Sequence, residues 1–84
     1  MAERREAGRQ RTLKAAKIII NNGTSVLDCV VRNLSVTGAW LEIENVIGIP
    51  DRILLSIGTG HQVTTRKARV VRRETFGLAV QFET

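Results

Sequence analysis

Three arginines near the N-terminus, Arg4, Arg5 and Arg9, are the residues whose chemistry is easiest to assign. A guanidinium group is a rigid planar fork that pairs bidentately with phosphate and with the O6/N7 edge of guanine, and it also stacks on base faces. The pattern Arg5-x-x-x-Arg9 is therefore suited to an anionic ligand that contains guanine. A solvated basic tail is the alternative, because ten arginines in 84 residues produce such a spacing about once by chance, and Arg69 with Arg73 forms a second one.

A second polar group follows the pattern Asn33-x-Ser35-x-x-Gly38. Asn and Ser are short hydrogen-bonding side chains that favour turns, and glycine allows either a positive φ or the close approach of another backbone segment. With six Asp or Asn, three Ser and seven Gly in the chain, about 0.02 occurrences of this pattern are expected by chance, so it is more specific than the arginine pair. It predicts either part of a ligand-binding site or an Asx-type turn that only shapes a hairpin.

Catalytic and metal chemistry is not predicted. The single histidine, His61, follows a Gly-Thr-Gly turn, where we expect it to be exposed and without a nucleophile beside it. The single cysteine, Cys29, cannot form an internal disulfide, and with only His61 as a second soft ligand no zinc or haem site can be assembled. Cys29 lies in an alternating apolar segment and is predicted to be a buried structural thiol. The sequence therefore predicts a protein that is not an enzyme and that holds no metal and no cofactor.

Positive charge is concentrated at both ends of the chain. The net charge is +5 and the pI is near 10.7. Residues 1–17 carry six basic and two acidic groups, residues 18–65 carry two and four, and residues 66–84 carry five and two. This distribution suits an anionic partner that is gripped by two segments. The basic residues of 66–73 lie on both faces of a predicted strand, so most are assigned to a solvated edge, with Arg66 and Arg69 as accessory candidates for a phosphate contact.

The elements that must position these residues are predicted to be strands. With 84 residues and 43% hydrophobic content, the chain has room for one small core. Residues 1–12 are poor in apolar side chains and are predicted to form a flexible ligand-binding arm, followed by a barrel domain over 13–84. Apolar residues then alternate between short turns, which predicts strands at 13–20, 25–32, 38–44, 52–57, 61–73 and 76–82. A small six-stranded antiparallel β-barrel is favoured because closure removes the exposed edges of an open sheet.

The alternation also assigns side chains to the two faces of these strands. Leu41 and Ile43 are predicted to face the core, which places Trp40 on the outer face near Gly38. There it is a candidate for stacking on a ligand or partner, with a packed surface tryptophan as the alternative. The last strand is predicted to turn one apolar face to the core, formed by Phe76, Leu78, Val80 and Phe82.

The two patterns in this order resemble the PilZ domain family, whose members are receptors for the bacterial second messenger cyclic di-GMP. The resemblance spans nearly the whole chain, includes the closing segment 77–82, and implies a six-stranded barrel. It implies that Arg5 and Arg9 grip guanine and phosphate, that Arg4 adds a phosphate contact, and that three further residues complete the pocket on the outer barrel wall, namely Asn33, Ser35 and Gly38. Asparagine stands at position 33 where aspartate is frequent in the family, so an amide replaces a charged acceptor.

The predicted function is that of a single-domain bacterial cyclic di-GMP receptor and adaptor. The arm would become ordered around the ligand, at an entropic cost, and a partner protein would read the new surface. Two alternatives stay open. One is a small nucleic-acid-binding barrel, which the charge favours but the scarcity of aromatic residues opposes, and the other is a PilZ-like module that binds proteins without a ligand. No DNA or RNA partner is expected. No segment approaches the roughly 18 apolar residues of a membrane span and none resembles a signal peptide, so no membrane insertion and a cytoplasmic location are predicted.

Overall fold

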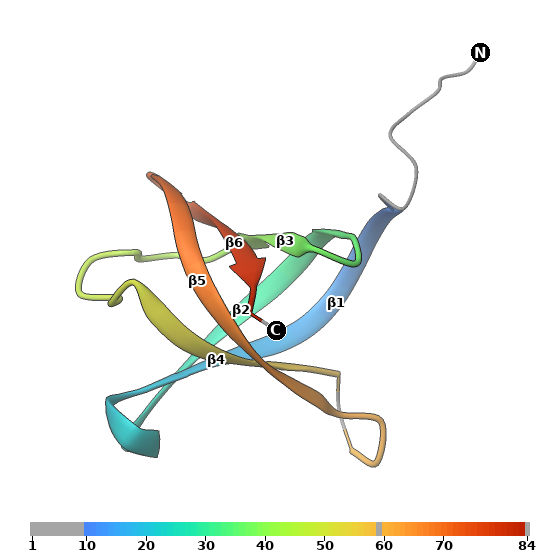
Figure 1. Ribbon diagram of the computed structural model, residues 1–84, viewed down its shortest axis with the longest axis horizontal. Helices are drawn as coiled ribbons and strands as arrows, with labels where there is room; N and C mark the ends of the chain where they lie inside the picture. Colours follow the sequence, from blue (N-terminus) through green and yellow to red (C-terminus); the bar gives the residue numbers. More distant parts are fainter. Residues whose placement is uncertain (1–9, 59, 84) are drawn as a thin grey trace.

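The computed structural model describes residues 10–58 and 60–83, with side chains from residue 13 onward. Its elements are, in chain order, β1 (Gln10–Ile20), the 3-10 turn η1 (Asn21–Gly23), β2 (Ser25–Leu34), β3 (Gly38–Glu42), β4 (Arg52–Ile57), β5 (Thr64–Glu74) and β6 (Gly77–Phe82). The strands pair antiparallel in the order β1-β2-β3-β6-β5-β4, and β4 returns to β1 (Figure 1). The predicted six-stranded antiparallel barrel is confirmed. No helix in this part of the chain is both long and apolar enough to cross a membrane.

The core fills the inside of the barrel with apolar side chains from all six strands. Five of its members are completely shielded from solvent: Ile18, Val31, Leu41, Leu55 and Leu78. Every buried side chain among the described residues is apolar. A polar or charged ligand therefore has no partner inside the barrel and must bind on the outer wall or at an end.

Cys29 belongs to this core, as predicted. Burial, and to a lesser extent the neighbouring Asp28 carboxylate, raises the pKa of the Cys29 thiol to about 11, against a smaller lowering by Lys17. The thiol is therefore protonated at neutral pH, where only the thiolate would be a nucleophile.

Several strand ends differ from the prediction, because strands pair through their backbones and this pairing does not require apolar side chains. β1 begins at Gln10 rather than at residue 13, because Gln10 and Arg11 pair through their backbones with Leu34 and Asn33 of β2. Apart from residues 10–12, the predicted arm lies outside the described residues. β2 continues to residue 34, β3 stops at 42, and β5 begins at 64 rather than 61.

One core assignment of the last strand is wrong. Leu78, Val80 and Phe82 are buried as predicted, whereas Phe76 has an exposed fraction of 63%. β6 begins only at Gly77, so Phe76 lies in the turn after β5. The alternation of a strand does not set the direction of a side chain in the turn before it.

A β-bulge on β2 changes the face on which Asn33 lies. The register between β2 and β3 passes from Val31 opposite Leu41 to Asn33 opposite Trp40, so Arg32 is an extra residue on β2. An extra residue moves every later side chain to the other face of the strand. Val31 is buried, and Asn33, two residues later, nevertheless lies on the outer face beside Trp40.

A second bulge does the same on β5. The register between β5 and β6 passes from Val70 opposite Val80 to Arg72 opposite Ala79, so Val71 is the extra residue. Val70 is buried and Val71 is about half exposed. Arg72 therefore lies on the outer face, although uninterrupted alternation would have turned it toward the core with Val70.

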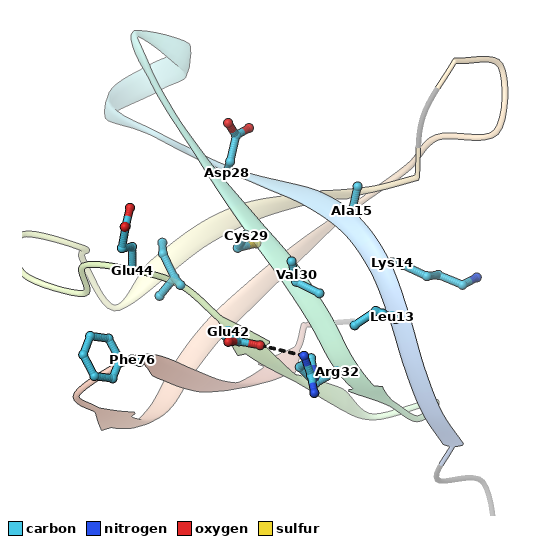
Figure 2. Close-up of a pocket in the computed structure, with 11 residues that line it drawn as sticks. Leu13, Lys14, Ala15, Asp28, Cys29, Val30, Arg32, Glu42, Glu44 and Phe76 are labelled. Atoms are coloured by element: carbon cyan, nitrogen blue, oxygen red, sulfur yellow. Dashed lines mark hydrogen bonds and ion pairs between the residues drawn. The ribbon is translucent and has the colours of Figure 1, made fainter.

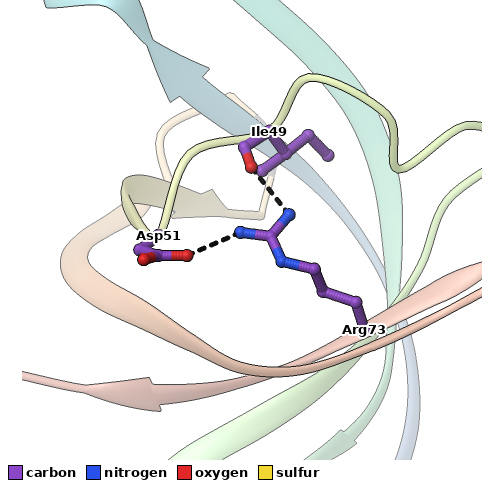
Figure 3. A network of polar contacts seen from close by, with 3 residues as sticks. All are labelled: Ile49, Asp51 and Arg73. Carbon is purple, nitrogen blue, oxygen red and sulfur yellow. Dashed lines mark hydrogen bonds and ion pairs between the residues drawn. The ribbon is translucent and has the colours of Figure 1, made fainter.

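Arg73 fastens the connection between β3 and β4 to the barrel. Its guanidinium donates one hydrogen bond to the backbone oxygen of Ile49 at 2.7 Å and another to the Asp51 carboxylate at 2.8 Å (Figure 3). The backbone N–H of Val70 also donates to the Asp51 carbonyl, at 2.7 Å. Arg73, one member of the second R-x-x-x-R pattern, thus has a structural role.

Candidate functional site

Ser35 closes the connection between β2 and β3. Its backbone N–H donates to the carbonyl oxygen of Gly38 at 2.9 Å, and its Oγ accepts hydrogen bonds from the N–H groups of Thr37 and Gly38, both at 3.3 Å. The Thr37 hydroxyl lies 3.2 Å from the same Oγ. Ser35 therefore shapes the turn. The side chain of Asn33 takes part in none of the hydrogen bonds described for this turn. Its amide therefore remains available for other contacts.

Gly38 is required here by a close approach and not by a positive φ. A Cβ atom at this position would collide with the backbone carbonyl oxygen of Val80, and Gly38 is not among the described glycines with positive φ. Gly38 pairs with Gln81 of β6, and the N–H of Phe82 donates to the carbonyl of Thr37 at 2.8 Å. The turn is thereby held directly against β6.

Four residues form one row across the outer face of four strands. Asn33 of β2 pairs with Trp40 of β3, Trp40 pairs with Ala79 of β6, and Ala79 pairs with Arg72 of β5. The two bulges bring the first and last members onto this face. Cross-strand partners are close neighbours, about 4.5–5.5 Å apart, so the four side chains share one surface.

A hollow of about 660 Å³ lies over this row and beside the turn, and is named here the turn pocket. Its volume falls within the range of about 300–1,000 Å³ that is usual for small-molecule sites. Four of its lining residues were predicted from the sequence, namely Asn33, Ser35, Gly38 and Trp40, and the residues that were not predicted include Arg72 and Gln81. Arg72 is the only charged side chain among its described lining residues.

Trp40 and Arg72 are held together in the wall of the turn pocket. The six-membered ring of Trp40 occupies the space over Gly77 that a side chain at position 77 would fill. The Cζ atom of Arg72 lies 5.8 Å from the centroid of the Trp40 ring, and Nε of Arg72 lies 3.2 Å from Oε2 of Glu74. From the sequence alone, Arg72 is assigned to a solvated edge. The signal that could have revealed its position is the apolar pair at positions 70 and 71, which breaks the alternation of β5.

The two accessory arginines take other positions. Cζ of Arg66 lies 4.0 Å over the ring of Phe82, and Arg66 lines a neighbouring hollow of about 530 Å³ that also borders Ser35. Nη2 of Arg69 donates to Oε1 of Gln81 at 3.1 Å. Arg69 therefore supports a residue of the turn pocket without lining the pocket itself.

The predicted arginines Arg4, Arg5 and Arg9 lie outside the described residues. The described chain begins at Gln10, which pairs with Leu34. Leu34 itself lines the turn pocket. The polypeptide therefore enters β1 beside this pocket.

A second hollow of about 660 Å³ lies elsewhere on the outer wall, mainly over β1 and β2 (Figure 2). It includes the exposed apolar side chains of Leu13 and Phe76 and the ion pair between Arg32 and Glu42, whose atoms are 2.9 Å apart. Its charged lining residues are two basic and three acidic ones, namely Lys14 and Arg32 against Asp28, Glu42 and Glu44. This balance is unfavourable for an anion, in contrast to the turn pocket.

The comparisons with known proteins agree with the barrel fold. Among solved structures, the chain is similar to the PilZ domain of CeSA from a cellulose-synthesising bacterium, with a TM-score of 0.76 and 14% identity over 93% of this chain and 82% of that one. It is also similar to an uncharacterised Legionella protein, with a TM-score of 0.64 and 16% identity over 90% of this chain and 76% of that one. At such identities the similarity shows a shared fold. No curated protein matches the chain.

The sequence itself matches the family model of the PilZ domain over residues 3–84. This match includes both sequence patterns and all six strands. Because it covers almost the entire chain, the resemblance noted from the sequence is confirmed, and the protein belongs to the PilZ domain family.

Proposed function

We propose that this PilZ domain is a receptor for cyclic di-GMP and that it binds the nucleotide in the turn pocket. The observation that carries the proposal is the row in which Asn33, Trp40 and Arg72 line one hollow next to the turn. An amide can hydrogen-bond the edge of guanine, an indole ring can pack against a base, and a guanidinium can pair with phosphate. Cyclic di-GMP offers all three of the corresponding partners: the edge of guanine, the face of the base and the phosphate.

In this proposal the N-terminal arginines complete the site. Arg5 and Arg9 grip guanine and phosphate, and Arg4 adds a phosphate contact. The chain enters β1 at Gln10, opposite a residue of the pocket wall, so a segment of nine residues is long enough to reach the ligand. This segment becomes ordered when the ligand binds, and a partner protein in the cytoplasm recognises the resulting surface.

The residues of the turn do not all distinguish a receptor from a module that binds only proteins. Ser35 and Gly38 are needed by the turn itself, so either kind of protein requires them. Asn33 is not used by the described hydrogen bonds of the turn, and Arg5 and Arg9 are the residues of the first sequence pattern. Substitutions at these three positions are therefore the informative ones.

Isothermal titration with cyclic di-GMP, GTP and cyclic di-AMP at physiological salt tests the proposal. We expect selective binding of cyclic di-GMP, and a loss of at least tenfold in affinity for Arg5→Ala and Arg9→Ala, since hydrogen bonds to charged groups are worth about 1.5–3 kcal/mol. Arg52→Ala is a matched control, because it removes the same charge from β4 at a position that does not line the turn pocket. Absence of binding to every guanine nucleotide would refute the receptor function and favour the protein-binding module.

The single tryptophan supplies a second readout for the same titration. Trp40 lines the turn pocket and is the only tryptophan of the chain, so its emission reports on this site alone. We expect a saturable change in emission with the dissociation constant found by calorimetry. A titration with single-stranded oligonucleotide at increasing salt tests the nucleic-acid alternative, because nonspecific binding of that kind collapses steeply with salt.

A further inference from the structure

We infer that Arg72 is a ligand-contacting residue of the turn pocket, where it pairs with a phosphate of the bound nucleotide. The inference rests on the proposed function, because it concerns the same pocket. It adds a cationic contact from β5, at the end of the row opposite Asn33, and neither sequence pattern includes it. Its first support is charge. Arg72 is the only charged side chain among the described residues that line the pocket. Of these residues, it alone can therefore attract an anionic ligand by its charge.

The direction of Arg72 depends on a specific feature of the backbone. Val71 is an extra residue on β5, and without it Arg72 would follow Val70 toward the core. Bulges often occur next to binding sites, where they redirect a side chain. Here the bulge places a guanidinium at the end of the row that begins with Asn33.

Two contacts orient the guanidinium before any ligand arrives. Nε of Arg72 pairs with Oε2 of Glu74 at 3.2 Å, and Cζ lies 5.8 Å from the centroid of the Trp40 ring. The Arg72 side chain nevertheless remains 66% exposed. The ion pair engages Nε, so the two Nη groups can form a bidentate pair with a phosphate.

The other arginines of β5 are engaged elsewhere. Arg73 donates to Ile49 and Asp51, Arg69 donates to Gln81, and Arg66 lies over Phe82 beside a different hollow. The role inferred for Arg72 is therefore not shared with its neighbours on the strand. This difference allows a control on the same strand.

The test compares Arg72→Gln with Lys67→Gln in calorimetric titrations with cyclic di-GMP. Both substitutions remove one positive charge from an exposed side chain of β5, but Lys67 does not line the turn pocket. We expect Arg72→Gln to weaken binding at least tenfold and Lys67→Gln to weaken it less than twofold. Arg72→Lys, which keeps the charge but loses the planar fork, should fall between them. Thermal unfolding of each variant, monitored by circular dichroism, shows whether the barrel is intact.

The outcomes separate this inference from the proposed function. If the unmodified protein binds cyclic di-GMP and Arg72→Gln binds as tightly as Lys67→Gln, the receptor function stands and the role of Arg72 is refuted. If the unmodified protein binds no guanine nucleotide, the receptor function fails and the inference fails with it. A selective loss in Arg72→Gln with an unchanged unfolding temperature establishes the contact.

Discussion

Replacing Gly38 with alanine tests the contact that holds the turn pocket together. The added methyl group would collide with the carbonyl oxygen of Val80. Val80 is fixed between two strands, since it pairs with Ala39 of β3 and with Val70 of β5. Because the obstacle is a backbone atom and not the end of a flexible side chain, either the turn or β6 must shift. Gly38 and Val80 both line the pocket, so the shift should also weaken cyclic di-GMP binding.

Two opposing effects decide the size of the change. Overpacking a well-packed position costs about 1–3 kcal/mol. Alanine lowers the entropy of the unfolded chain, which stabilises a protein by about 0.4–1 kcal/mol where the native φ allows it. The φ of Gly38 is not positive, so this gain applies and the collision is the only penalty. The difference between the two effects is a net loss centred on about 1.3 kcal/mol, which for a domain of this size lowers the unfolding temperature by roughly 5–10 °C.

Urea and thermal unfolding monitored by Trp40 emission measure this loss. Val36→Ala is the matched control, because Val36 lies at the tip of the same turn and is 81% exposed. An exposed substitution of this kind usually changes stability by less than about 0.5 kcal/mol. An unfolding temperature for Gly38→Ala at or above that of the unmodified protein, with unchanged ligand binding, would refute the close approach of the turn to β6.

Three further predictions follow from individual contacts. Gly77→Ala places a methyl group where the Trp40 ring lies, so we expect the emission maximum to move to longer wavelength and cyclic di-GMP binding to weaken. Arg73→Ala removes the bonds to the connection between β3 and β4 and should lower the free energy of unfolding in urea by about 1 kcal/mol, with unchanged ligand affinity. Because the pKa of the Cys29 thiol is raised to about 11, iodoacetamide should modify it slowly in the folded protein at pH 8, faster as the pH approaches 11, and rapidly at pH 8 in urea. An unchanged emission maximum in Gly77→Ala would contradict the first prediction, and a changed ligand affinity in Arg73→Ala would contradict the second. Modification of Cys29 at pH 8 that is as fast in the folded protein as in urea would contradict the third.

The strands could be predicted because residues that face a packed core alternate along the chain. In β4 the buried residues are Ile53, Leu55 and Ile57, and the predicted range 52–57 coincides with the strand. The start of β1 could not be predicted in the same way. Gln10 and Arg11 belong to the sheet through their backbones, and backbone pairing imposes no pattern on side-chain type.

The turn residues could be predicted because their pattern is local, whereas Arg72 could not. Its place in the pocket depends on the extra residue at Val71 and on the pairing of β5 with β6, and the pairing is a property of the whole barrel. Phe76 shows the opposite error. The predicted alternation includes Phe76, which lies one residue before β6 begins, in a turn where the alternation of a strand no longer applies.

The pairing of the strands also gives a physical meaning to the uneven distribution of charge along the chain. The row that begins at Asn33 can be followed one strand further, because the backbone of Arg11 in β1 pairs with Asn33. One end of the row therefore lies at β1, in the basic segment 1–17, and the other lies at Arg72, in the basic segment 66–84. The net-negative middle of the chain supplies Asn33 and Trp40, which are uncharged. A dianionic ligand in the turn pocket would thus lie over neutral residues beside the cationic Arg72, and no acidic side chain among the described lining residues would oppose it.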